Sequence, residues 1–144
     1  MKFKNFPIYR IEWVTSTFLI GTALLSLTVV PWFLWTQFNL PAEAANKVHG
    51  WGFIWAMFVF YYYATGFGIT LGYHRLFSHI SFKAKWPVKL FVLLFGAASF
   101  ENSALDWSAD HRIHHKHVDE DEDPYDISKG FFYAHIGWLL FRLK

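Results

Sequence analysis

Residues 13–42 read WVTSTFLIGTALLSLTVVPWFLWTQFNLPA, a run without a single charged side chain. A second uncharged run, VHGWGFIWAMFVFYYYATGFGITLGYH, occupies residues 48–74. Each run is longer than the ~20 residues that a membrane-spanning helix needs. Scattered glycines and one proline are tolerated in such helices. We therefore predict an all-α membrane protein with two transmembrane helices, at about 14–37 and 48–72, followed by a cytoplasmic and interfacial part over 73–144.

The composition supports this fold class. Hydrophobic residues make up 54% of the 144 residues and aromatic residues 22%, more apolar bulk than a soluble domain of this size can hide. A pair of buried helices in a soluble bundle is the alternative, and the length of the runs speaks against it. The chain has no cysteine, which excludes disulfide scaffolds, thiolate metal sites and cysteine nucleophiles. Any soft-ligand metal chemistry must therefore come from the eight histidines.

The charges that flank the two runs predict their orientation. The N-terminal flank and the segment after the second run are basic, whereas the charges of the intervening loop cancel. Short cytoplasmic loops carry the excess of lysine and arginine. We therefore expect the N-terminus and residues 73–144 on the cytoplasmic side. The basic residues are Lys2, Lys4, Arg10, Arg75, Lys83, Lys85 and Lys89.

Two later apolar stretches are too short to span a membrane. Trp86–Leu105 and Gly130–Phe141 are predicted to lie in or dip into the interface. The most polar part of the chain lies between them and includes the acidic run Asp119–Asp123. We interpret this run as a solvated loop or helix end in preference to a metal or partner site.

Five histidines form two clusters on the predicted cytoplasmic side. The second cluster is His111, His114 and His115, which fall within about 100° of arc on one face of an α-helix. Three imidazoles on one face can converge on a metal ion, and imidazole suits Zn, Cu, Fe and Ni. His117 points well away from this face and is taken as solvent-exposed, while the isolated His49 and His135 are taken as structural.

The first cluster, His74 and His79, does not fit a regular helix. Residues five apart differ by about 140° around an α-helix, so the two side chains diverge. They can point at one centre only if the helix ends or widens between them, as it does in a π-bulge, and such bulges concentrate at functional sites. The alternative is that the two histidines serve different metal ions.

These motifs resemble those of membrane fatty-acyl desaturases. The segment HRLFSH at 74–79 resembles their first histidine box, and ENSALDWSADHRIHH at 101–115 resembles the second box with its upstream flank. DPY at 123–125 and GFFYAHIGW at 130–138 resemble the stretch that follows. The match is to the stearoyl-CoA or Δ9 branch and extends from about Tyr73 to the end of the chain.

The resemblance implies a di-iron centre that uses dioxygen to place a cis double bond in a long acyl chain, with Δ9 as the expected position. It implies that the five clustered histidines are iron ligands: His74, His79, His111, His114 and His115. It also implies contacts with the acyl carrier's head group by Asn102, Asp110 and Arg142, and a place near the bend of the acyl tunnel for Trp107 and Trp138. Redox-active iron suits this chemistry, whereas zinc cannot supply it.

The implied partners follow from the same resemblance. They are an acyl-CoA, acyl-carrier-protein or acyl-lipid substrate, membrane lipid, and an external electron donor such as cytochrome b5 or a ferredoxin; no nucleic acid is expected. Ala109 and Leu143 stand where animal acyl-CoA members have basic residues, which weakens the assignment to CoA.

Carboxylates usually orient metal-bound histidines. Glu101, Asp106 and Asp110 are the candidates.

The family has two further spans and a third histidine box, neither of which lies within residues 1–144. We therefore interpret the chain as the N-terminal half of a four-span desaturase fold, and we expect it to be inactive alone. The rival readings are a histidine-box hydroxylase or ketolase, a metal-binding membrane protein or metal transporter, and an inactive truncated paralogue. A transporter would place ionisable groups inside the spans, and both runs lack charges.

Overall fold

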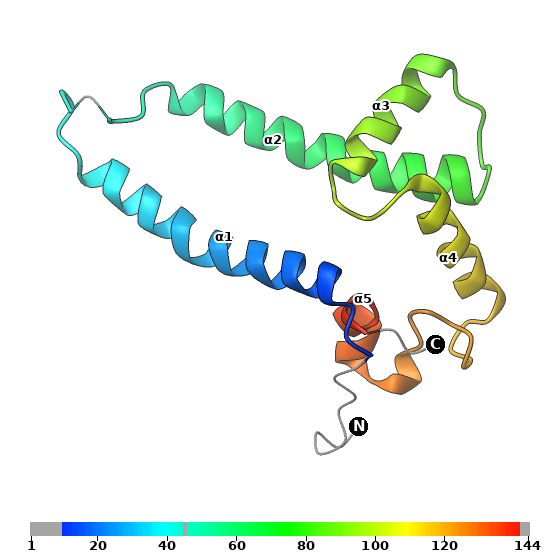
Figure 1. The fold of residues 1–144 in the computed structure, drawn as a ribbon. Helices are drawn as coiled ribbons and strands as arrows, with labels where there is room; N and C mark the ends of the chain where they lie inside the picture. Colours follow the sequence, from blue (N-terminus) through cyan, green and yellow to red (C-terminus); the bar gives the residue numbers. More distant parts are fainter. Residues whose placement is uncertain (1–9, 45, 142–144) are drawn as a thin grey trace. The chain divides into compact units, whose positions relative to one another are not determined.

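The computed structural model describes residues 10–44 and 46–141, and its regular elements are all helical. Within those residues, the one strand-like contact is an isolated antiparallel bridge between Ile11 and Phe141. The prediction of an all-α protein is confirmed. The chain divides into two compact units, which are residues 1–49 with 127–144 (unit 1) and residues 50–126 (unit 2). Figure 1 shows the helices of each.

Helix α1 (Trp13–Asn39) is the long helix of unit 1. Its apolar side chains are exposed, with Leu24 at 58% and Leu27 at 75%. A helix that is apolar all round suits a hydrocarbon environment. The hydroxyls of Thr22 and Thr28 are satisfied within the helix, because each donates a hydrogen bond of 2.7 Å to the backbone carbonyl four residues earlier. The helix therefore leaves neither hydroxyl without an acceptor, as a membrane interior requires.

The C-terminal segment of unit 1 comprises η4 (Ile127–Lys129), η5 (Tyr133–Gly137) and α5 (Trp138–Leu140). It docks on the first turn of α1 through the backbone carbonyl of Leu140. That oxygen accepts hydrogen bonds from the amide of Glu12 at 2.9 Å and the hydroxyl of Ser16 at 3.2 Å. The short apolar stretch predicted near the end of the chain is thus a short helical segment.

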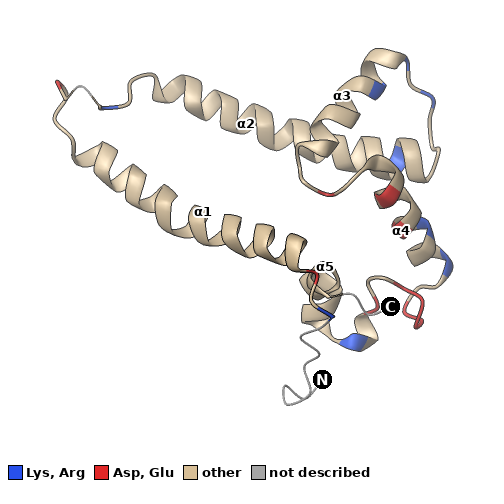
Figure 2. Cartoon of the chain, viewed as in Figure 1, with Lys and Arg blue, Asp and Glu red and all other residues tan. Residues whose placement is uncertain are grey.

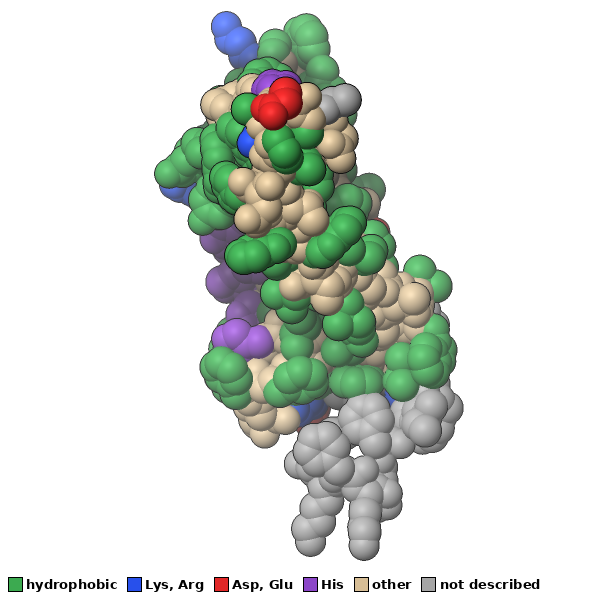
Figure 3. Space-filling view, turned by 90° about the vertical axis from the view of Figure 1, so that its left-hand side faces the viewer, with side chains coloured by type: hydrophobic (Ala, Val, Ile, Leu, Met, Phe, Trp, Pro, Cys, Tyr) green, Lys and Arg blue, Asp and Glu red, His purple; other side chains and the backbone are tan. Residues whose placement is uncertain are grey.

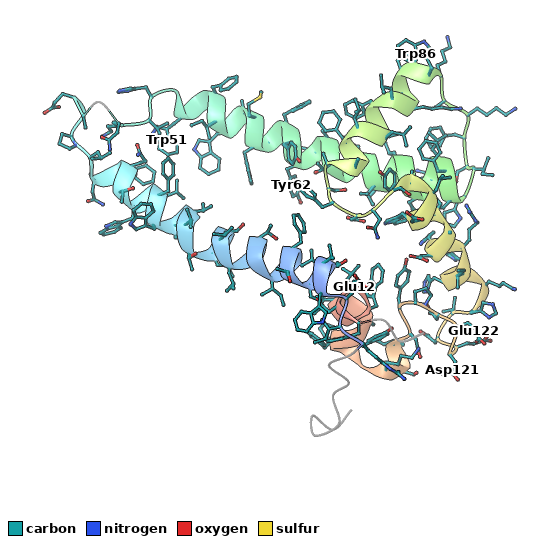
Figure 4. All side chains as sticks on the ribbon, in the orientation of Figure 1. Glu12, Trp51, Tyr62, Trp86, Asp121 and Glu122 are labelled. Atoms are coloured by element: carbon teal, nitrogen blue, oxygen red, sulfur yellow. The ribbon has the colours of Figure 1, made fainter. Side chains whose placement is uncertain are left out.

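Unit 2 begins with α2 (Trp51–Phe67), which continues without a break into the π-helix η3 (Gly68–Ser78). Helix α3 (Trp86–Ala97) and helix α4 (Ala104–Lys116) follow. Figure 4 marks Trp86 at the beginning of α3. The prediction of one interfacial helix over Trp86–Leu105 was wrong in length, because α3 ends at Ala97 and α4 begins at Ala104. The backbone turns between α3 and α4, where Phe100 and Asn102 adopt positive φ angles of 61° and 65°.

Among the residues that the structure describes, two helices are long and apolar enough to cross a membrane, Trp13–Asn39 and the continuous helix Trp51–Ser78. The predicted span 48–72 thus starts before α2 and ends inside η3. Figure 2 shows α1 and α2 free of lysine, arginine and acidic residues, while charged residues occur around α3, α4 and the loops.

Close packing of η3 against α3 fixes the position of the first histidine cluster. A Cβ added to Gly72 would lie 2.6 Å from Cβ of Val92, and one added to Gly68 would lie 2.7 Å from the backbone of Phe95. Small residues allow helices to approach this closely in membrane proteins. The ring of Tyr73, 1% exposed, lies against Gly96 in the same interface. The residue that precedes His74 is therefore held on a packed surface.

Candidate metal centre

The π-helical hydrogen bonding of η3 brings His74 and His79 together. The amide of His79 donates to the carbonyl of His74 at 3.0 Å, a bond that spans five residues in place of the usual four. The hydroxyl of Ser78 donates to the carbonyl of Tyr73 at 2.7 Å, which also spans five. The Nε2 atoms of His74 and His79 are 3.1 Å apart as a result. Of the two sequence-based alternatives, the widened helix is the one observed.

Helix α4 supplies the other histidines. Ser103 caps its first turn, since the Ser103 hydroxyl accepts from the amide of Asp106 at 3.1 Å and donates to the Asp106 carboxylate at 2.7 Å. This reciprocal cap fixes where the helix begins. His111 and His115, one turn apart on one face, then have their Nε2 atoms 3.1 Å from each other.

Four Nε2 atoms from the two helices meet at one point. The Nε2 atom of His79 is 3.1 Å from that of His111, which joins the η3 pair to the α4 pair. The potential ligand atoms of all four residues lie within 4.8 Å of one another. Figure 3 shows purple histidine side chains at the surface. We call His74, His79, His111 and His115 the four-histidine cluster.

Ordinary hydrogen bonds do not account for the four-histidine cluster. A neutral imidazole nitrogen offers either one N–H or one lone pair. His79 and His111 each place Nε2 against two other Nε2 atoms, so one N–H or one lone pair cannot satisfy both contacts. Four lone pairs directed at one cation satisfy all of them. Metal–nitrogen bonds of about 2.1 Å separate neighbouring nitrogens by about 3.0 Å at right angles and about 3.4 Å in a tetrahedron. The observed spacing fits a metal ion held by imidazole.

Burial keeps His111 neutral. It lowers the pKa of His111 to about 4, and repulsion from the neighbouring histidines adds to the effect. An imidazole with this pKa carries a free lone pair at neutral pH, the form that binds metal.

His114, the fifth predicted ligand, lies outside the four-histidine cluster. Its Nδ1 atom lies 2.9 Å from both carboxylate oxygens of Asp123, and its ring is 5.0 Å from that of Tyr125. Burial alone would raise the pKa of Asp123, but hydrogen bonds from the amides of Asp119 and Tyr125 and from His114 outweigh it and lower that pKa. Burial, with the nearby carboxylates, raises the pKa of the Tyr125 hydroxyl to about 12.

The sequence-based candidates for a carboxylate that orients a ligand do not contact the histidines. Asp106 belongs to the Ser103 cap, and Glu101 accepts a hydrogen bond of 2.9 Å from the indole of Trp107. Asp110 is partly buried, which raises its pKa, and Asp106 adds to the shift. Asp123 is the carboxylate that meets a histidine of the second cluster. It was missed because its run of acidic neighbours is typical of a solvated loop.

Trp107 is the predicted substrate-binding residue that contacts the four-histidine cluster. Its ring stacks on His111 with centroids 4.8 Å apart and an angle of 26°. Asn102 is exposed in the turn before α4, and Trp138 begins α5 in unit 1. Arg142 lies outside the described residues. His117, predicted to be exposed, is half-buried, and its Nδ1 lies 3.1 Å from the Glu120 carboxylate.

A cleft of about 470 Å³ opens on unit 2 between α2–η3 and the turn that precedes α4. Tyr62, Tyr63 and Phe67 contribute its aromatic wall. The turn contributes Ser99 and Glu101, the residue that accepts the Trp107 hydrogen bond. Glu101 therefore both lines this cleft and contacts the indole of Trp107, the ring that stacks on His111.

The known proteins to which this chain is similar include acyl-CoA desaturases. A probable acyl-CoA desaturase of Schizosaccharomyces pombe is 54% identical over 82 residues, which are 57% of this chain and 17% of that protein. Acyl-CoA desaturase 1 of Saccharomyces cerevisiae is 52% identical over 84 residues, 58% of this chain and 16% of that protein. The stearoyl-CoA desaturase of Homo sapiens is 44% identical over 90 residues, 62% of this chain and 25% of that protein. No family model matches the chain.

The matched stretch thus spans between a sixth and a quarter of the length of these relatives. The two long apolar helices agree with a protein integral to the membrane. Identities of 44–54% over 82 to 90 residues are evidence of common descent. Over more than half of its length, the chain is similar in sequence to acyl-CoA desaturases.

Proposed function

We propose that this protein is a fatty acid desaturase in which residues 1–144 supply the N-terminal part of the desaturase domain, with two spans and two histidine clusters. The proposed reaction removes two hydrogen atoms from a long acyl chain, at the Δ9 position, and leaves a cis double bond. Dioxygen accepts these hydrogens together with two electrons and two protons, and two water molecules form. The observation that carries the proposal is the convergence of four Nε2 atoms from η3 and α4.

In the proposed site His74, His79, His111 and His115 hold iron through Nε2, and His114 contributes the fifth imidazole. Iron bound there would supply the redox chemistry with dioxygen that an unactivated CH₂ group requires. Zinc has no redox chemistry, so it does not fit the reaction. The stacked ring of Trp107 restrains the plane of the His111 imidazole. The neutral state of His111 keeps its lone pair available.

The substrate in this proposal is a long acyl chain on CoA, acyl carrier protein or a lipid. Its head group would meet Asn102, Asp110 and Arg142, and Trp107 and Trp138 would line the acyl path. The aromatic wall of the cleft beside Glu101 supports an apolar ligand on this side of unit 2. Electrons would come from a cytochrome b5 or ferredoxin type donor. The basic flanks favour a cytoplasmic location for the N-terminus and the histidine clusters.

Product analysis tests this proposal. The full-length gene product is expressed in a yeast strain that lacks its own Δ9 desaturase and needs added unsaturated fatty acids. We expect growth without the supplement and new cis-Δ9 fatty acids in the lipid extract, both lost in a His79→Ala variant. Hydroxylated or ketone products would contradict desaturation. A double bond at another position would contradict only the Δ9 assignment.

A further inference from the structure

Asp123 is set apart from the acidic residues around it. Its side chain is 0% exposed, whereas its neighbours Asp119, Glu120, Asp121 and Glu122 are exposed. Figure 4 shows Asp121 and Glu122 on the loop that follows α4. Successive turns return the chain to α4, because the amide of Glu120 donates to His117 and the amide of Asp123 donates to Glu120. The fold thus places one carboxylate of this run against His114.

The Asp123 carboxylate makes its contacts with nitrogen atoms. Oδ2 accepts from the amide of Asp119 and Oδ1 from the amide of Tyr125, both at 2.9 Å. Both oxygens also lie 2.9 Å from Nδ1 of His114. An ionised carboxylate is an acceptor only. The proton of the contact with His114 must therefore come from the imidazole, which places it on Nδ1.

This proton assignment decides which atom of His114 can bind a metal. In a neutral imidazole with Nδ1 protonated, Nε2 carries the lone pair. Nε2 is also the atom through which the four-histidine cluster converges. We propose that Asp123 is a positioning residue that holds the proton of His114 on Nδ1 and so keeps Nε2 as its metal-binding atom. The metal-binding half of this inference rests on the proposed function, whereas the tautomer does not.

The tautomer can be measured without metal. Histidine labelled with ¹⁵N is incorporated into the metal-free full-length gene product, and nitrogen chemical shifts are recorded for the wild type and for Asp123→Asn. Loss of signals in His114→Gln assigns the residue. We expect a protonated Nδ1 and a bare Nε2 for His114 in the wild type. Because an asparagine amide can donate to Nδ1, we expect Asp123→Asn to raise the population protonated on Nε2.

A matched control is available within the same loop. Glu120 pairs with Nδ1 of His117 at 3.1 Å but is 64% exposed, so Glu120→Gln alters a histidine–carboxylate pair and leaves Asp123 in place. We expect His114 to be unchanged in this variant. A wild-type His114 protonated on Nε2, or one whose shifts are the same in Asp123→Asn, overturns the inference. The wild-type spectrum decides the question even if Asp123→Asn does not fold.

Metal affinity provides the second readout. Loss of a carboxylate that orients a ligand histidine costs about 10- to 100-fold in metal affinity. We expect Asp123→Asn to weaken Fe²⁺ binding by this factor and Glu120→Gln to change it by less than about twofold. A changed tautomer with unchanged Fe²⁺ affinity refutes the metal-binding half. A wild-type protein that binds no iron counts against the proposed function and leaves the tautomer result to stand alone.

Discussion

Replacing Gly96 with alanine adds a methyl group to the face of α3 that packs on η3. The added Cβ would lie 2.7 Å from Cζ and 2.9 Å from Cδ1 of the Tyr73 ring. Carbon atoms pack favourably at about 3.5–4.0 Å, so the buried ring must move by roughly 1 Å. Because Tyr73 directly precedes His74, the displacement reaches the four-histidine cluster.

The expected cost can be worked out from two opposing terms. Overpacking of a packed interior costs roughly 1–3 kcal/mol. Alanine in a helix gains roughly 0.5–1 kcal/mol over glycine. The net loss in the free energy of unfolding for Gly96→Ala therefore lies between about 0 and 2.5 kcal/mol, with a central value of about 1 kcal/mol. Gly21 in α1 has no atom within 4 Å of an added Cβ, so Gly21→Ala is the matched control and should be neutral or slightly stabilising.

The assay is equilibrium unfolding of the full-length gene product in bicelles by added SDS, followed by tryptophan fluorescence. A double-mutant cycle with Tyr73→Leu identifies the cause, because a shorter side chain makes room for the methyl group. We expect the two substitutions together to cost less than the sum of the single costs, with a coupling of about 0.5–3 kcal/mol. Equal stability of Gly96→Ala and Gly21→Ala, or strict additivity in the cycle, would refute the packing argument.

Three further predictions concern the α4 cap, the histidines and the topology. Ser103→Ala removes both hydrogen bonds of the cap, and we expect a loss of about 1 kcal/mol in the same unfolding assay; an unchanged midpoint would contradict the role of the cap. His79→Ala should abolish double-bond formation in lipid extracts and His117→Ala should preserve it, since only His79 belongs to the four-histidine cluster; equal loss in both would count against the assignment. Because residues 1–144 contain no cysteine, Ala42→Cys and Glu122→Cys each add a single labelling site to this stretch, with the unsubstituted protein as the background. A membrane-impermeant maleimide added to intact cells should label the first and spare the second, and the reverse pattern would overturn the proposed orientation.

The helical fold could be predicted from the sequence because uncharged apolar runs of this length rarely form anything other than membrane-spanning helices. Residues 13–42 and 48–74 could be assigned to helices without knowledge of their tertiary contacts, since the hydrocarbon thickness of the membrane sets the required length. The end of the second helix was harder to place. The π-helix extends the continuous helix to Ser78, and its packing depends on the contact between Gly72 and Val92, a residue of α3.

Only part of the histidine site could be predicted from the sequence. The separation of His74 and His79 demanded a widened helix or two metal ions, and the π-helical hydrogen bonding selects the first. His114 shares a helical face with His111 and His115, but its Nδ1 lies against Asp123. The loop after α4 brings Asp123 back to His114, which lies nine residues earlier in the sequence. Helical periodicity cannot predict such a return. The Asp-Pro-Tyr motif at 123–125 was the one signal that pointed to this carboxylate.

The central claim is that the four-histidine cluster holds iron through imidazole nitrogen. X-ray absorption at the iron edge, recorded on the purified full-length gene product and on its His111→Ala variant, tests it most directly. We predict bound iron in the wild type with a shell of imidazole nitrogens at about 2.1 Å and loss of most of that iron in the variant. Purified protein without iron, or iron whose spectrum is the same in His111→Ala, would contradict the account.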